Sequence, residues 1–348
     1  KIMKNMGNVS ENISDRRQFL KIATTIALPI MIQNLISTLV NTVDTVMLGY
    51  VSQDAMAASS LAGQVYTVLW MTLNGLIAGG CVMASQYWGK KDYDTIERVM
   101  GLAVRFSLVL SLIFFVVAFC FPDVVMRLFT DEEAIITEGI RYLKIIAFSY
   151  VFLGFSQIYL SIQRSVERVV LPTVTYIVSL AVNVLLNATF IFGLFNMPKL
   201  GLVGVAIGTV TARFVECVIC VIHSMYNDTI KFRIKYVFAK AGILLGDFMK
   251  LSIPSLINDV AWSLAFSMYS VILGHLGSDA VVANSVANMA LNIGAIATRG
   301  FANATTVIVG KTLGENNIEA AKVYARRMVR ITVLSCVIGG GIIIGIRR

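Results

Sequence analysis

Long apolar stretches separated by short polar segments run through the chain from residue 19 onward. Each is at least as long as the about 20 residues that an α-helix needs to cross the hydrocarbon core of a bilayer. The pattern predicts an all-α polytopic membrane protein with about nine transmembrane helices, on residues 19–47, 55–87, 99–121, 140–162, 170–195, 202–225, 249–273, 280–309 and 323–346.

The composition agrees with this prediction. Hydrophobic residues make up 57% and charged residues 14% of the 348 positions, and the mean hydropathy is +0.77, values outside the usual range of soluble domains. The net charge of +9 would favour a nucleic acid partner in a soluble protein, but here the basic residues lie in short loops between apolar stretches. We therefore expect a lipid bilayer around the chain and no nucleic acid partner.

The basic residues also predict the topology. The N-terminal tail and the even-numbered loops are rich in Lys and Arg, whereas the odd-numbered loops carry few, and the third is mainly acidic. The positive-inside rule then places the N-terminus in the cytoplasm, and we expect the chain in an inner (plasma) membrane. The tail up to Arg17 lacks the apolar core of a signal peptide, so the first spanning helix is expected to act as the insertion signal.

An internal repeat divides the chain. Sliding the sequence against itself by the separation of Pro29 and Pro254 (254 − 29 = 225) keeps many residues in register without a gap. Gly75 falls on Gly300 and Gly89 on Gly314, and the register holds over three helices. Because six spanning helices separate equivalent points, the halves are expected to be parallel repeats related by an axis along the membrane normal.

The repeat predicts two six-helix lobes, the second of them incomplete. The expected divisions are a cytoplasmic tail at 1–18, a first lobe at 19–226, a linker at 227–248 and three helices of the second lobe at 249–348. Part of the linker is expected to form an amphipathic helix at the membrane interface, and the alternative is a solvated loop. A completed repeat would add three helices, about 100 residues, so we expect a C-terminally truncated piece of a longer protein.

Seven segments carry the most distinctive motifs: LPIMIQNLISTLVNTVDTVMLG (28–49), ASQYWGKKD (84–92), RSVERVVLP (164–172), VNVLLNATFIFG (182–193), GLVGVAIGTVTARFVE (201–216), IPSLINDVAWSLAFSMYSVILGHLG (253–277) and FANATTVIVGKTLG (301–314). Together they resemble the bacterial branch of the multidrug and toxic compound extrusion (MATE) family, over nearly the whole chain. The resemblance implies two lobes that form a V around a central cavity. It also implies alternating access driven by sodium or protons, with export of mostly cationic amphipathic compounds.

The first lobe holds the main candidates for ion coupling. An ionisable group in hydrocarbon costs about 3 kcal/mol or more, and Asp44 lies inside the first helix, where the resemblance implies an acidic residue. Asn183 and Asn187 share one helix face and offer oxygens that suit a hard cation. We expect sodium at Asp44, Asn183 and Asn187, or a proton on Asp44. The alternatives are a helix-end cap for Asp44 and interhelical hydrogen bonds for the two Asn. A proton-coupled branch of the family has Asp in place of Asn187, which argues against a carboxylate pair here.

The second lobe offers a carboxylate and an aromatic ring on one helix. Asp259 is expected to anchor a coupling ion or a substrate cation, and Trp262 to stack on a delocalised cation, with lipid or interface packing as the alternative for the ring. Arg299 is expected either to pair with Asp259 or to face water. Asn34, Tyr66 and Trp70 complete the predicted substrate-binding set. Structural roles are expected for Pro29, Pro254 and the ion pair Arg213–Glu216.

The leading hypothesis is a monomeric secondary active multidrug antiporter, not an enzyme, with no cofactor besides its coupling ion. No GxxxxGK[ST] run is present, so an ion gradient is the expected energy source. A lipid-linked oligosaccharide flippase is the alternative within transport, and it would need an Arg-rich cavity, for which Arg299 and Arg213 are the candidates. An intramembrane prenyltransferase would need clustered carboxylates for magnesium, and the close pair is Asp92 and Asp94. A third alternative is an inactive fragment of an exporter.

Overall fold

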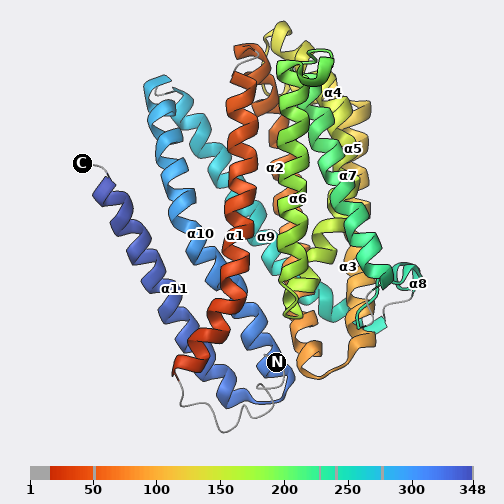
Figure 1. Ribbon diagram of the computed structural model, residues 1–348, viewed down its shortest axis with the longest axis vertical. Coiled ribbons are helices and arrows are strands. Elements are labelled where there is room, and N and C mark those ends of the chain that lie inside the picture. The colour runs from red at the N-terminus through yellow and green to blue at the C-terminus, as the bar shows by residue number, and fades with distance from the viewer. Residues whose placement is uncertain (1–15, 50–51, 227–228, 240–241, 276–277, 347–348) are drawn as a thin grey trace.

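The computed structural model describes residues 16–49, 52–226, 229–239, 242–275 and 278–346 (Figure 1). Every regular element within these ranges is helical, which confirms the all-α class. Nine long helices fall on the nine predicted stretches, and two short helices and a 3₁₀ turn join them. The long helices are α1 (Arg16–Gly49), α2 (Gln53–Gly89), α3 (Tyr93–Cys120), α5 (Glu133–Ser165), α6 (Val170–Phe192), α7 (Leu202–Tyr226), α9 (Gly242–His275), α10 (Ser278–Gly314) and α11 (Ile318–Ile346); the short elements are α4 (Pro122–Arg127), η2 (Leu194–Asn196) and α8 (Ile234–Phe238).

Six of these helices are long and apolar enough to cross a membrane, among the residues that the structure describes. They are α1, α2, α3, α5, α6 and α7. The helices α9, α10 and α11 are 34, 37 and 29 residues long, which exceeds the about 20 residues of a span. That these three cross the membrane stays a prediction.

The repeat is visible in the helices and in the turns between them. The bounds of α10 follow those of α2 by the same interval as the sequence repeat (278 − 53 and 314 − 89, both 225). In the α2–α3 turn Lys91 has φ 59°, and in the α10–α11 turn Asn316 has φ 60°. The next residues, Asp92 and Asn317, each accept a hydrogen bond from the amide three residues later, at 3.1 and 3.0 Å, and so cap the following helix.

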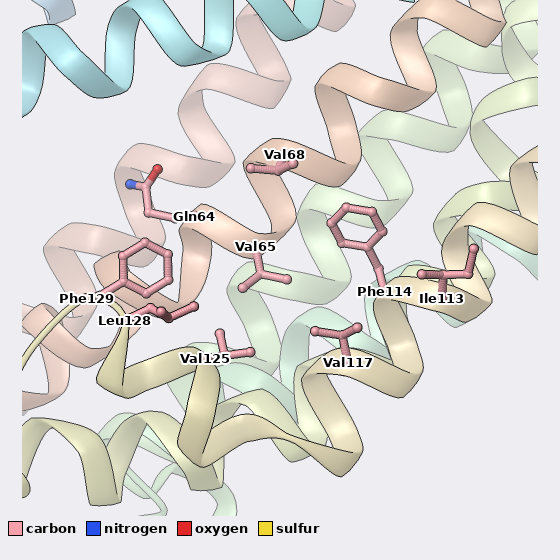
Figure 2. A pocket seen from close by; sticks show the side chains of 9 residues that line it. All are labelled: Gln64, Val65, Val68, Ile113, Phe114, Val117, Val125, Leu128 and Phe129. Atoms are coloured by element: carbon pink, nitrogen blue, oxygen red, sulfur yellow. The ribbon is translucent and has the colours of Figure 1, made fainter.

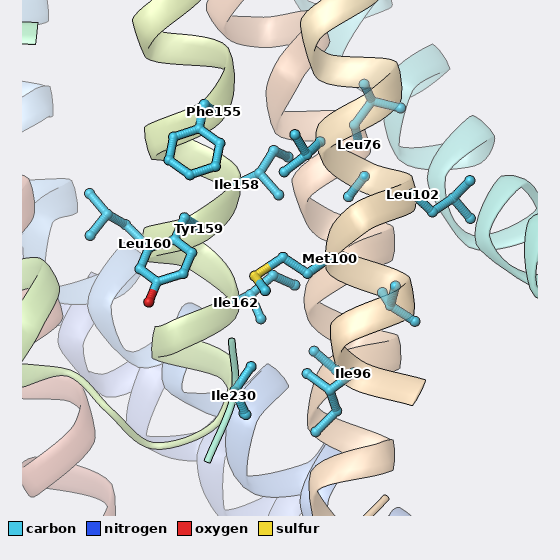
Figure 3. Packing of buried hydrophobic residues seen from close by; sticks show 14 of the residues in the cluster. Leu76, Ile96, Met100, Leu102, Phe155, Ile158, Tyr159, Leu160, Ile162 and Ile230 are labelled. Atoms are coloured by element: carbon cyan, nitrogen blue, oxygen red, sulfur yellow. The ribbon is translucent and has the colours of Figure 1, made fainter. Parts of the chain in front are cut away.

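Helix α5 forms the centre of the first-lobe helices α1–α7, where it packs against α2, α3 and α7. Its side chains Leu143 and Tyr150 are fully buried toward one end, and Ile158 and Leu160 toward the other. Figure 3 shows Ile158 and Ile162 of α5 facing Met100 and Ile96 of α3. A helix buried on nearly all sides needs apolar residues around its whole circumference, which agrees with the apolar residues on every face of α5.

The second-lobe helices α9–α11 pack against α1 and α2, so that α11 lies at one side of the molecule and α3 and α7 at the other (Figure 1). Phe19 and Ile30 of α1 share a buried cluster with Ala304 of α10 and Met328 of α11. We call the end that holds the α2–α3 and α10–α11 turns the basic end, because its exposed side chains include Lys90, Lys91 and Lys322. The opposite end, which holds α4, is the distal end.

The predicted linker contains the first turns of α9 as well as the short helix α8, so the second-lobe helix begins earlier than predicted. Residues 229–238 contact α3, although several of their side chains remain exposed. Glu97 of α3 is 4% exposed and accepts hydrogen bonds from the Lys231 amide (2.8 Å) and from Arg233 Nε (2.7 Å). Tyr236 packs against Gly101, where a side chain would collide with it. This part of the predicted linker therefore packs on the first lobe.

Candidate functional site

Amide and hydroxyl side chains meet between α6 and α7, toward the distal end. Asn187 Nδ2 donates to Asn183 Oδ1 (3.4 Å), and Asn183 Nδ2 donates to Thr209 Oγ1 (3.2 Å). Both asparagines are buried. A side chain on Gly208 would collide with Asn187 Oδ1, so the glycine leaves room for the amide. The structure thus brings the two predicted asparagines together and adds Thr209, which the sequence analysis missed.

The backbone of Asp44 lies in α1, while its side chain lies outside the described residues. Its depth follows from the register between α1 and α6, because Gln33 Nε2 donates to Thr173 Oγ1 at 2.8 Å. Both helices run from the basic end to the distal end. Asp44 is eleven residues beyond Gln33 (44 − 33 = 11), and the same step from Thr173 reaches Val184. The backbone of Asp44 therefore lies at the depth of Asn183.

A second polar cluster lies nearer the middle of the first lobe, around the carboxylate of Glu216. This residue is 0% exposed and forms the expected ion pair, with Arg213 Nη1 at 2.8 Å from Oε2. Its Oε1 accepts hydrogen bonds from Ser156 Oγ (2.8 Å) and Gln157 Nε2 (3.0 Å), and Tyr176 donates to Gln157 Oε1 at 2.8 Å. The carboxylate therefore accepts hydrogen bonds from side chains of α5 and α7, and Tyr176 of α6 joins the network through Gln157. The pair was predictable from its spacing, but its neutral partners come from distant segments.

Two predicted substrate residues lie beside this cluster. Tyr66 and Trp70 of α2 stack with their rings 6.4 Å apart and an interplanar angle of 14°. Arg213 Nη2 lies 3.5 Å from the Tyr66 hydroxyl oxygen. Both rings are only partly buried. The aromatic pair therefore borders the Arg213–Glu216 cluster of the first lobe.

The contact between α2 and α9 sets the depth of the second-lobe candidates. Gly79 lies against Ser252, and Gly75 against Leu256, with no room for a side chain at either glycine. The two helices are antiparallel here, so a residue that lies n positions before Gly75 in α2 is level with the residue n positions after Leu256 in α9. This register puts Trp70 level with residue 261, which lies between Asp259 and Trp262. These candidates share one depth, just beyond the closest contact between the two helices.

The contact between α1 and α10 sets the depth of the remaining candidates, Asn34 and Arg299. Gly300 lies against Met31, and the backbone oxygen of Ala27 is the next neighbour, so Asn34 of α1 is level with residue 297 of α10. Arg299 lies close to the same depth, and its side chain is exposed. By these registers Asn34, Trp70, Trp262 and Arg299 lie within about a turn and a half of one another, on α1, α2, α9 and α10, and Tyr66 lies about one turn beyond Trp70. The pairing of Arg299 with Asp259 stays a prediction.

The side chains of Asp259 and Trp262 are accessible in the described part of the chain. Asp259 is partly buried and hydrogen-bonds with Asn258. Trp262 is 57% exposed and stacks on Phe266 with ring centroids 5.6 Å apart. Pro29 and Pro254 lie inside α1 and α9, where each removes one backbone hydrogen bond.

An apolar recess of about 310 Å³ lies elsewhere, between α2, α3 and α4 (Figure 2). One polar side chain, Gln64, stands at its edge, and none of the predicted site residues contributes to it. Its walls are formed by Val65, Val68, Ile113, Phe114, Val117, Val125, Leu128 and Phe129. The recess is therefore apolar apart from Gln64 and has no charged group that would hold an ion.

A family model described as MatE matches the chain twice, at residues 29–189 and 254–347. The chain belongs to the MatE family. The two matched segments begin at Pro29 and Pro254, the residues that define the internal repeat. The bacterial MATE resemblance of the sequence motifs is thereby confirmed.

Curated relatives of this MatE chain have multidrug names. It is 24% identical to a probable multidrug resistance protein YoeA of Bacillus subtilis, over 91% of this chain and 68% of the relative. It is 24% identical to the multidrug export protein MepA of Staphylococcus haemolyticus, over 75% of this chain and 57% of the relative. The chain thus spans between about half and about two thirds of these relatives' length.

Solved structures of MATE transporters show the same fold. One, described as MATE in the bent conformation, superposes with a TM-score of 0.81 at 19% identity, over 91% of this chain and 70% of the other. Another, described as the outward-facing conformation of a multidrug resistance MATE family transporter, gives 0.80 at 20% identity, over 90% and 70%. The helical two-lobe fold class is therefore supported by both the helices and the comparisons.

Proposed function

We propose that this chain forms the first lobe and three second-lobe helices of a secondary active multidrug exporter, which antiports cationic amphipathic compounds against sodium or protons by alternating access. The observation that carries the proposal is the cluster of the buried Asn183 and Asn187 with the partly buried Thr209, near the depth of Asp44, in a chain of the MatE family. Family membership supports transport, and the cluster supports ion coupling.

The ion site consists of Asp44, Asn183 and Asn187, with Thr209 as an added ligand. Amide and hydroxyl oxygens are the ligands that a hard cation such as sodium prefers, and their burial removes competing water. A single carboxylate among neutral oxygens gives a site of net charge near zero when one monovalent cation is bound. Either sodium or a proton on Asp44 fulfils this condition, so both coupling ions remain in the proposal.

The substrate site lies between the lobes, at the level shared by Asn34, Trp70, Asp259, Trp262 and Arg299. Aromatic faces attract delocalised cations, with about 0.5–2 kcal/mol per favourable contact. The carboxylate of Asp259 supplies the charge that selects a cation. Tyr66 extends the aromatic surface and contacts Arg213, so binding there reaches the interior of the first lobe.

The exporter works as a monomer in the bacterial inner membrane, with its N-terminus and the basic end in the cytoplasm. The distribution of Lys and Arg between the loops supports this orientation. It is embedded in the lipid bilayer, and its substrates are small cationic drugs or metabolites.

Structural contacts engage three of the four candidate residues of the alternative functions, and Arg299 is the fourth. A lipid-linked oligosaccharide flippase needs several arginines in the cavity, but Arg213 is engaged by the buried carboxylate of Glu216. A prenyltransferase needs Asp92 and Asp94 for magnesium. Asp92 instead caps α3, and Asp94 pairs with Arg98 at 2.8 Å. These contacts favour the exporter over the flippase and the prenyltransferase.

The test is export of a fluorescent cationic dye by cells that express the full-length protein. Sodium and proton gradients are collapsed separately, and the wild type is compared with Asp44→Asn and Asp259→Asn. Asp247→Asn is the matched control, because Asp247 is an exposed carboxylate on the same helix as Asp259. Export that needs one gradient, is lost in the site variants and persists in the control supports the proposal. Export that is absent from the wild type, or unchanged in both site variants, overturns it.

A further inference from the structure

The contacts between the two lobes obey the repeat. Gly75 of α2 lies against Leu256 of α9, and Gly300 of α10 lies against Met31 of α1. Gly75 and Gly300 are equivalent positions, and so are Met31 and Leu256 (300 − 75 and 256 − 31, both 225). The inter-lobe contact is therefore a pseudo-two-fold interface, in which each lobe presents the same glycine to the same position of the other.

The ends of α2 and α10 repeat this arrangement at closer range. A side chain on Gly89 would collide with the backbone oxygen of Lys311, and one on Gly314 would collide with the backbone oxygen of Gln86. Gln86 and Lys311 are again equivalent residues (311 − 86 = 225). Backbone packs on backbone here, so the basic end is closed between the lobes.

The ion pair between Lys311 and Glu167 joins the lobes at this contact. Lys311 Nζ lies 2.9 Å from both carboxylate oxygens of Glu167, and Trp88 Nε1 donates to Glu167 Oε2 at 3.1 Å. Glu167 lies in the α5–α6 turn with φ 63°, a left-handed conformation that non-glycine residues seldom adopt. The Lys311 and Glu167 side chains are only 17% and 18% exposed. The pair therefore joins the two lobes in a partly dehydrated position.

We propose that Glu167, Lys311 and Trp88 form an inter-lobe latch that holds the basic end closed and so positions the lobes with the distal side open. The proposal rests on the proposed function, because a latch between lobes has a purpose only if the lobes separate during transport. Glu167 and Lys311 come from elements that part when the basic end opens, whereas Trp88 stays with Glu167 in the first lobe.

The ion pair stabilises only the conformation in which the basic end is closed. In the closed state the two charges attract each other with little intervening water, and in the open state water solvates each separately. Removing one charge leaves the other poorly solvated in the closed contact, which disfavours closure. Lys91 and Glu315 also lie in this electrostatic environment, since Lys311, Lys91 and Glu167 all act on the Glu315 carboxyl.

The experiment measures the distance between the lobes directly in the full-length protein. Spin labels are attached at Lys90→Cys and Lys322→Cys, two exposed positions on opposite lobes, after replacement of the native cysteines. Pulsed electron-spin distance measurements then compare the wild type with Glu167→Gln, Lys311→Gln and the exchange Glu167→Lys with Lys311→Glu. Arg98→Gln is the control, because it removes an equally short ion pair within α3, between side chains that are 57% and 55% exposed.

The latch predicts that each single variant raises the ratio of open to closed basic ends by about tenfold or more, that the exchange restores most of the closed population, and that Arg98→Gln leaves the distances unchanged. Single variants with wild-type distances overturn the latch, and so does opening in the Arg98→Gln control or an exchange that stays open. Dye export by the labelled wild type is measured in parallel. Its absence counts against the proposed function, while the distances still decide the latch.

Discussion

Replacement of Glu216 by Gln tests whether the buried ion pair of the first lobe stabilises the fold. Glu216 is 0% exposed, and the Arg213 side chain is 20% exposed. Removal of one partner of a buried pair costs about 3–5 kcal/mol. The partial exposure of Arg213 and the oxygen that Gln keeps for Ser156 and Gln157 favour the lower limit. We expect Glu216→Gln to reduce the free energy of unfolding by about 3 kcal/mol.

The assay is reversible unfolding of the full-length protein in mixed micelles, followed by tryptophan fluorescence. Arg141→Gln is the matched control, since Arg141 and Glu138 have the same three-residue spacing but are 63% and 36% exposed. It should cost less than about 0.5 kcal/mol. The double variant Glu216→Gln with Arg213→Gln should cost clearly less than the sum of the single variants. A loss for Glu216→Gln no larger than that of the control would refute the reasoning.

Two further predictions concern the ion site and the linker. Gly208→Ala should displace the Asn187 amide and reduce dye export at unchanged protein level, whereas Gly63→Ala, at a glycine with open space around it, should export normally; equal export by the two variants would contradict this account of the ion site. Glu97→Gln should weaken the hydrogen bond from Arg233 Nε and raise the rate of limited proteolysis in residues 229–238 several-fold, and a cleavage rate equal to that of the wild type would show that the linker is held by other contacts.

Much of the architecture was predictable because it depends on local pattern. A stretch of about 20 apolar residues can satisfy its backbone in a bilayer only as a helix, so the helices appear where the hydropathy places them. The 225-residue repeat likewise fixes corresponding turns, with Lys91 and Asn316 in the same left-handed conformation. The spacing of Asn183 and Asn187 correctly put both on one face, and that of Arg213 and Glu216 put them in reach of each other.

Other features required the packed structure. The linker reads as polar and basic, yet Glu97 fixes it to α3 from more than a hundred residues away, and no local pattern records such a partner. Thr209, Gln157 and Tyr176 are ordinary residues of apolar helices until those helices pack side by side. Their roles depend on which faces meet.

The sequence by itself determined the class of molecule, the positions of its helices, its repeat and its family, because hydropathy, periodicity and motif are properties of neighbouring residues. Only the tertiary structure decided which polar groups share an environment and how the lobes meet. Glu167 and Lys311 are 144 residues apart, and their meeting depends on the closure of α2 against α10. That closure is possible because Gly89 and Gly314 let two backbones approach, a steric condition that exists only between packed helices.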